Sequence, residues 1–200
     1  MPVIFVPTSP ALVPALGAGD VSSSDLLRGA RALVDDILTR HQVTEINLVG
    51  SREPRNYTAH TGSFRAWGAP EVTVGAGNYL AELVQRFVLI ECTLPITVGE
   101  IRKDPTVLDM VGIDGPAGLS DRAPLSLIPT ASQRHAWCMD LLSGERVSWP
   151  KNRDDLAADG IVEPEMWWML RSLRPAGGQL AMVADAHGVG RYVASWEGVS

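Results

Sequence analysis

The stretch Val3-Ile4-Phe5-Val6-Pro7 sets the fold: a continuous apolar run at residues 3–6, rich in β-branched residues, predicts a strand that Pro7 stops. Such a run is typical of a strand buried on both faces. Apolar residues then recur at helical spacing over 26–38, after possible capping side chains at 22–25. A second apolar run at 45–50 ends in glycine and predicts another strand. Strand, helix and strand in this order predict a βαβ unit with parallel strands and a right-handed crossover.

The rest of the chain continues the alternation of strands and helices. Asn78 is a possible cap for a helix whose apolar residues share one face, and Pro164 lies in the first turn of another predicted helix. A Gly-rich turn between two apolar runs predicts a C-terminal hairpin. Residues 102–124 are rich in proline, glycine and acids, and we assign them no structure. Further strands are expected at 71–74, 96–101, 125–128, 179–184 and 191–196. We therefore expect a single α/β domain over residues 1–200, with a central mixed β-sheet flanked by helices.

Composition excludes several classes of protein. The 200 residues are 46% hydrophobic and carry a net charge of −6, so a packed core is expected and a dedicated nucleic-acid binder is not. No apolar run is long enough to span a membrane. The first basic side chain is Arg28, so the charged start of a signal peptide is missing. With only Cys92 and Cys138 present, we expect reduced thiols and a cytoplasmic protein.

Candidate binding residues lie in the loops that follow the predicted strands, because ligands of open α/β sheets bind beyond the carboxyl ends of strands. Thr8 and Ser9 follow the first strand, and Ser51 follows the second. We predict that these three line a pocket. The loops at 130–135 and 185–190 are placed in the same way.

Histidines are the candidates for catalysis and metal binding. A non-haem iron centre needs two histidines and a carboxylate on one face of the metal. His60 lies after the second strand and His135 after the strand predicted at 125–128, so these two are the candidate catalytic residues. His41 ends the first helix, where it complements the helix dipole. No two histidines have a close metal-ligand spacing, so hydrogen-bonded or surface roles are the simpler interpretation for each.

The tryptophans suggest a further surface. Trp167 and Trp168 are neighbours on a predicted helix, so their side chains point about 100° apart and cannot both enter one core. One of them either covers a groove or a homodimer interface, or belongs to a second core. Six tryptophans are present, at positions 67, 137, 149, 167, 168 and 196.

Three stretches, in order along the chain, carry a resemblance to a known family. They are residues 6–16, Val6-Pro7-Thr8-Ser9-Pro10-Ala11-Leu12-Val13-Pro14-Ala15-Leu16; residues 62–68, Gly62-Ser63-Phe64-Arg65-Ala66-Trp67-Gly68; and the ending 187–196, His187-Gly188-Val189-Gly190-Arg191-Tyr192-Val193-Ala194-Ser195-Trp196. Together they resemble the actinobacterial family of class III extradiol ring-cleavage dioxygenase B-like subunits, of which this chain would be a diverged member. The segment from about 100 to 175 matches poorly.

The resemblance implies a mixed-sheet α/β fold, often dimeric, and in active members Fe(II) held by two histidines and a glutamate. Catechol-type substrates are then cleaved with O₂. The first ligand histidine should fall in the turn after the first strand, where this chain has Thr8 and Ser9. Hydroxyls are poor replacements for imidazole on Fe(II). The glutamate is not identified, and Glu91, Glu163 and Glu197 are its candidates.

Two functions from different classes follow, with a third possibility. The first is a dioxygenase-like fold without the standard Fe(II) centre and with no cofactor, which binds a small ligand or a protein partner. The alternative is an active Fe(II)-dependent extradiol dioxygenase, in which His60, His135 and one acid converge on the metal. The third is a structural role with the tryptophans at an interface.

Overall fold

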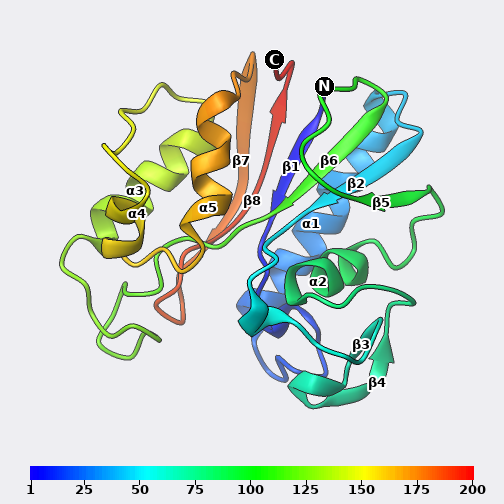
Figure 1. The fold of residues 1–200 in the computed structure, drawn as a ribbon, viewed down its shortest axis with the longest axis horizontal. Helices are drawn as coiled ribbons and strands as arrows, with labels where there is room; N and C mark the ends of the chain where they lie inside the picture. The colour runs from blue at the N-terminus through cyan, green and yellow to red at the C-terminus, as the bar shows by residue number, and fades with distance from the viewer.

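The structure is a computed structural model that describes all 200 residues (Figure 1). It is one α/β domain built around a six-stranded sheet, with the strand order β5-β2-β6-β1-β8-β7. The strands of this sheet are β1 (Val3–Val6), β2 (Glu45–Val49), β5 (Ile96–Val98), β6 (Val107–Gly112), β7 (Gly177–Ala184) and β8 (Arg191–Glu197). The helices are α1 (Val21–Arg40), α2 (Leu80–Val88), α3 (Ala131–Leu142), α4 (Asp154–Ala158) and α5 (Pro164–Trp168).

Smaller elements fill the connections. A separate two-stranded sheet pairs β3 (Ser63–Phe64) with β4 (Ala69–Thr73). Four 3-10 helices are present, η1 (Pro10–Leu12), η2 (Pro54–Asn56), η3 (Arg65–Trp67) and η4 (Met169–Ser172). No helix has the length and apolar character that a membrane crossing requires.

The main sheet is mixed, as expected. Strands β5, β2, β6 and β1 run parallel to one another, with β6 paired to both β1 and β2. Strand β8 runs antiparallel to β1 and forms the predicted hairpin with β7. The β1-α1-β2 unit is therefore parallel as predicted, but β6 lies between its two strands.

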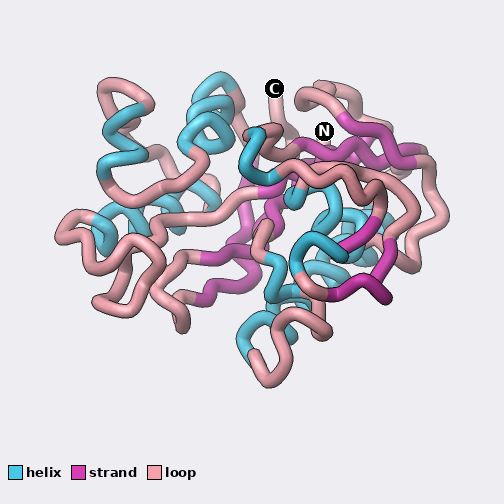
Figure 2. The backbone as a smooth tube through the Cα atoms, turned by 60° about the horizontal axis from the view of Figure 1, so that its bottom comes forward, coloured by secondary structure: helices cyan, strands magenta, loops and turns pink.

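Helices cover both faces of the sheet, which explains why β1 is apolar throughout (Figures 1 and 2). Ile4 and Val6 pack in one core with α1 and α2. Val3 and Phe5 point to the opposite face and pack with α3, α4 and α5. Since both faces are buried, alternation of apolar and polar residues is absent and the strand is one continuous apolar run.

The segment at 102–124 contains the strand β6, which lies in the middle of the sheet. It was not predicted because Asp109 interrupts the apolar run. This carboxylate is fully buried, where it accepts hydrogen bonds from the Asn47 side chain at 2.6 Å and from the Arg102 backbone N–H at 3.1 Å. Burial raises the pKa of Asp109 above its usual value. A buried acid can lie in a central strand when it has such hydrogen-bond partners. The pattern of apolar residues does not reveal these partners.

The strand predicted at 125–128 is wrong. These residues form a loop in which Leu125 and Leu127 are exposed and Ser126 has a φ of 55°. A short apolar run does not by itself distinguish a strand from other structure. His135 therefore lies in α3 and not in a loop after a strand. The strand predicted at 71–74 overlaps β4, but it belongs to the small sheet and not to the central one.

The helix predicted around Pro164 is α5, extended by η4. Its two neighbouring tryptophans differ in burial, as expected for side chains that point about 100° apart on a helix. Trp167 is fully buried, whereas Trp168 is partly exposed. Of the two alternatives for the tryptophans, Trp167 thus belongs to a second core, which lies between the sheet and α3–α5.

Candidate functional site

The candidate site lies where the chain leaves β1 and β6 in opposite directions. From β1 the chain passes through α1 on one face to β2, while from β6 it passes through α3, α4 and α5 on the other face to β7. β1 and β6 are neighbouring parallel strands. Diverging connections leave a crevice beyond the carboxyl ends of two such strands, which is where open α/β sheets bind ligands.

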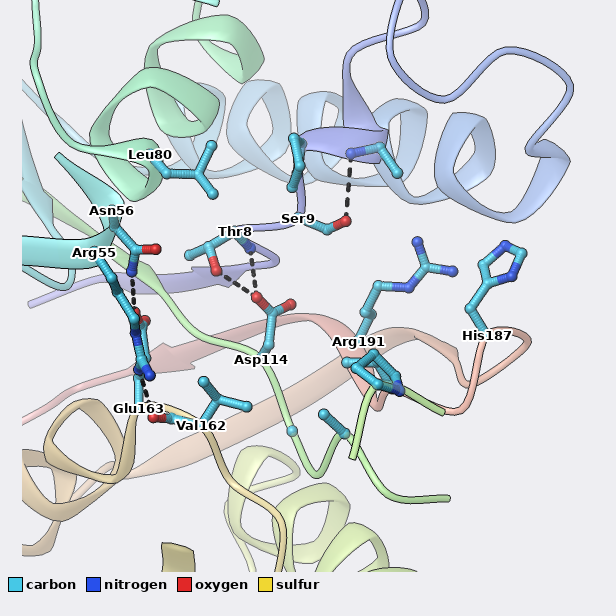
Figure 3. A pocket seen from close by; sticks show the side chains of 16 residues that line it. Thr8, Ser9, Arg55, Asn56, Leu80, Asp114, Val162, Glu163, His187 and Arg191 are labelled. Atoms are coloured by element: carbon cyan, nitrogen blue, oxygen red, sulfur yellow. Dashed lines mark hydrogen bonds between the residues drawn. The ribbon is translucent and has the colours of Figure 1, made fainter. Parts of the chain in front are cut away.

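A cavity of about 430 Å³ occupies this position (Figure 3). Thr8 and Ser9 contribute from the loop after β1, and Asp114 from the loop after β6. Glu163 lies just before α5, and Arg191 is the first residue of β8. Much of the remaining wall is apolar. Figure 3 shows Asp114 between Glu163 on one side and Arg191 on the other.

Asp114 is the central polar group of this cavity. Its Oδ2 accepts hydrogen bonds from the backbone N–H of Thr8, at 3.2 Å, and from the Thr8 hydroxyl. Its Oδ1 is shielded from solvent and has no hydrogen-bond partner. Burial disfavours the charged form and raises the pKa of Asp114 to about 6, although the two hydrogen bonds from Thr8 oppose this shift. The negative charge of Glu163 raises it further.

The neighbouring chain fixes the position of Asp114. The indole N–H of Trp167 donates to the Asp114 carbonyl oxygen at 2.8 Å. The next residue is Gly115, whose backbone N–H donates to the Gly190 carbonyl at 2.7 Å. A Cβ at Gly115 would collide with the Tyr192 hydroxyl, so only glycine fits beneath this loop.

Thr8→Val tests the hydrogen bond that faces the cavity. Valine keeps the shape of the side chain but cannot donate to Asp114, so we expect the pKa of Asp114 to rise above about 6. The titration of the Asp114 carboxyl carbon, followed by NMR, measures this. Thr39→Val, on the exposed side of α1, is the control and should leave that pKa unchanged. An unchanged or lower pKa in Thr8→Val would contradict the described role of the hydroxyl.

On the basic side of the cavity, Arg191 and His187 lie beside the carboxylate of Asp20. Asp20 caps α1 by accepting from the Ser23 backbone N–H at 3.0 Å. The same carboxylate lies 3.1 Å from His187 Nε2 and 3.7 Å from Arg191 Nη1. Partial desolvation raises the pKa of Asp20, but the hydrogen bonds from Ser23 and the nearby cations outweigh it and hold the pKa below its usual value.

Arg191 has hydrogen-bond partners for some of its donor groups but not for all of them. Only 2% of this residue is exposed, and its guanidinium donates to the hydroxyls of Ser23 and Ser22. Its Nε is buried and has no partner. Two residues that line the cavity thus carry a shielded polar atom without a partner: the acceptor Asp114 Oδ1 and the donor Arg191 Nε.

On the acidic side of the cavity, no cation is close enough to pair with Asp114 or Glu163. Glu163 accepts at Oε1 from the Asn56 side chain and makes no hydrogen bond at Oε2. Neither Glu163 nor Asp114 forms an ion pair. The nearby Arg55 is exposed and donates to the Val162 carbonyl at 2.8 Å.

The predicted pocket residues are distributed unevenly. Thr8 and Ser9 line the cavity. Ser51 does not; it is buried and accepts from the Glu53 backbone N–H at 3.3 Å, in a neighbouring depression. His60 is exposed in the turn before β3, where its backbone N–H donates to the Thr58 hydroxyl. The histidine that does line the cavity is His187.

His135 belongs to a separate buried contact. Its Nδ1 lies 2.6 Å from the Tyr192 hydroxyl, and the two rings stack with centroids 5.4 Å apart. Burial lowers the pKa of His135, which favours a neutral imidazole. This pair packs α3 against β8 and does not line the cavity.

The donor groups around the cavity do not fit an Fe(II) centre with two histidines and one carboxylate. No group of three or more histidine, cysteine, aspartate or glutamate side chains is arranged to hold a metal ion. At the end of β1 the available groups are hydroxyls, and that of Thr8 is already bonded to Asp114. Of the candidate glutamates, Glu163 lines the cavity, whereas Glu197 pairs with Arg40 and Glu91 lies in a different depression.

Asp114 and Arg191 were not predicted as site residues. Asp114 follows β6, so it was missed together with that strand. An acid two residues after an apolar strand is a signal that becomes visible once the strand is recognised. Arg191 begins a correctly predicted strand, but its reach into the cavity depends on tertiary structure.

No protein-family model matches this chain, and no curated protein matches it in sequence.

Proposed function

We propose that this protein binds a small organic molecule in the cavity beyond β1 and β6, in a class III extradiol dioxygenase-like fold that lacks the iron centre. The volume of about 430 Å³ lies within the range of about 300–1,000 Å³ that ligand pockets occupy. Apolar walls with a few convergent polar groups are the usual composition of such pockets. The free cysteines, Cys92 and Cys138, support a cytoplasmic setting.

The observation that carries this proposal is the pair of shielded polar atoms in two residues that line the cavity. Asp114 Oδ1 and Arg191 Nε each lack a hydrogen-bond partner. Leaving a buried donor or acceptor unsatisfied costs about 1–3 kcal/mol. A ligand that carries both a donor and an acceptor would satisfy the two atoms at once, while its hydrocarbon part contacts the apolar wall.

Ring cleavage on iron is the less supported alternative. It requires two imidazole ligands and a carboxylate around one metal. His187 is the histidine at the cavity, and it is engaged with Asp20. His60 and His135 lie elsewhere, so their proposed convergence finds no support in the geometry.

Ala11→Trp tests whether the cavity binds ligands. Ala11 lines the cavity from η1 and is partly exposed, so an indole there can occupy the space without disturbing the core. Benzylamine, benzyl alcohol and benzoate serve as probes of one size and differing charge. We expect at least one to bind the native chain, and its affinity to fall by about tenfold or more in the variant, which is about 1.4 kcal/mol. Ligand-observed NMR and calorimetry measure this.

Ala136→Trp is the matched control, since it adds the same ring to an exposed position on α3. It should bind the probes like the native chain. If none of the probes binds, or if both tryptophan variants bind them equally well, the cavity is not the binding site and the proposal fails.

A further inference from the structure

We propose that the ligand of this cavity is an organic cation, a protonated amine with an apolar body, held by Asp114 and Glu163. This inference rests on the proposed function, because it names the chemical class of the ligand in the same cavity. It is carried by the imbalance of charge between the two sides of the cavity.

The cationic side chains already have their partners. Arg191 and His187 share the carboxylate of Asp20, which lies 3.7 Å from the first and 3.1 Å from the second. Arg55 is exposed, where water screens its charge, and it donates to the Val162 carbonyl. Asp20 offsets the charge of Arg191, and His187 and Arg55 are exposed to water, so little net positive charge remains inside the cavity to attract an anionic ligand.

Neither carboxylate has a cation of its own: the charge of Arg191 lowers the pKa of Asp114, but Arg191 is paired with Asp20 at 3.7 Å. Asp114 is held by two donors from Thr8 and Glu163 by one from Asn56, and all of these donors are neutral. Neither acid forms an ion pair. Their like charges also act on each other, since Glu163 is among the causes that raise the pKa of Asp114. Two fixed negative charges beside an apolar wall are stabilised most by a cation that enters with the ligand.

An ammonium group matches the free acceptor atoms. It carries three donors, and the shielded Asp114 Oδ1 and the unbonded Glu163 Oε2 are both acceptors. The acceptor that satisfies Arg191 Nε then belongs to the body of the ligand, since an ammonium has none. Hydrogen bonds between charged partners are roughly twice as strong as neutral ones. Leu80, Val162 and Val189 line the same cavity and provide contacts for a hydrocarbon body.

A metal cation is not favoured at this position. Calcium takes six to eight oxygen ligands and magnesium an octahedral set. No group of three or more acidic, histidine or cysteine side chains is arranged around a common point. The apolar part of the wall would also contact nothing if the occupant were a bare ion.

The inference is tested by comparing the affinities of three probes that differ in charge. At about pH 7.5 benzylamine is protonated, benzyl alcohol is neutral and benzoate is anionic. We expect benzylamine to bind about tenfold or more tightly than benzyl alcohol, and benzoate to bind most weakly, as measured by calorimetry. Asp114→Asn keeps the shape of the side chain and removes its charge. It should lower the affinity for benzylamine by about threefold or more, with Glu163 supplying what remains of the preference, and leave the affinity for benzyl alcohol nearly unchanged.

Asp140→Asn, on the exposed face of α3, is the matched control and should keep the preference for the amine. If benzyl alcohol or benzoate binds as tightly as benzylamine, and Ala11→Trp still abolishes that binding, the cation is wrong while the ligand-binding function stands. An affinity for benzylamine that Asp114→Asn leaves unchanged also overturns the assignment. If no probe binds, the proposed function itself fails.

Discussion

Trp167→Ala is expected to lower the free energy of unfolding by about 3–5 kcal/mol, the range for removing a large aromatic side chain from a core. Trp167 is fully buried, and its ring packs edge-on against Tyr192 with centroids 5.9 Å apart. Alanine leaves a cavity between α5 and the sheet and also leaves the Asp114 carbonyl without its donor. Urea denaturation followed by circular dichroism measures the loss.

Two further variants separate packing from the hydrogen bond. Trp167→Phe keeps most of the ring but cannot donate to Asp114, so we expect a smaller loss of about 1–3 kcal/mol. Trp168→Ala removes a partly exposed ring from the same helix and should cost less than Trp167→Ala. Equal losses for the two alanine variants would contradict the assignment of Trp167 to the core.

Asp114→Asn is expected to stabilise the protein at neutral pH by up to about 3 kcal/mol. Burial raises the pKa of Asp114 from 3.8 to about 6, and each tenfold change in proton affinity corresponds to about 1.4 kcal/mol. The folded state holds the proton more tightly than the unfolded state, so native stability falls as pH rises from about 4 to about 6. Above this pH window the buried charge of Asp114 lowers the free energy of unfolding by the full amount. Asparagine avoids this loss because it carries no charge.

The measurement is the free energy of unfolding in urea at several pH values from about 4 to 8. The difference between native protein and Asp114→Asn should grow with pH through this window and then level off. Asp140→Asn, at an exposed position, should follow the native curve. A difference independent of pH, or an Asn variant less stable than native protein at pH 8, would show that the buried charge is not the cause.

A carboxylate that lowers stability is informative about function. Sites that act on ligands are commonly retained at the expense of stability. Asp114 lies in a loop whose backbone is fixed from two sides, by Trp167 and by the bond of Gly115 to Gly190. The protein thus holds a costly charge in a rigid position, as expected of a preorganised binding group.

The parts of the fold that the sequence predicts are those with regular patterns. The run Val3–Val6 identifies β1, and helical spacing identifies α1, because burial imposes a period on apolar residues. The C-terminal hairpin follows from its Gly-rich turn. In contrast, β6 contains a buried Asp109 that is satisfied by Asn47 and Arg102, and these partners come together only in the folded chain.

The sequence predicts where the site lies better than it predicts which residues line it. The rule that ligands bind beyond strand ends led to Thr8 and Ser9, which do line the cavity. The same rule selects Ser51, which does not line the cavity, because the rule does not say which strand ends border a crevice. His60 and His135 are selected by residue type and by the order of the predicted strands. His135 was misplaced because the strand at 125–128 does not exist. Asp114 could not be placed without β6.

The position of β1 between β6 and β8 affects how the protein folds. One neighbour of this strand, β6, lies about 100 residues further along the chain and the other, β8, about 190, so β1 cannot be paired on both edges until β8 has been synthesised. Pairings between distant segments are slow to form, and the unpaired apolar strand is prone to aggregate meanwhile. Thr8 and Asp114 follow two of these strands and Arg191 begins the third, so the cavity that they line is among the last features to form.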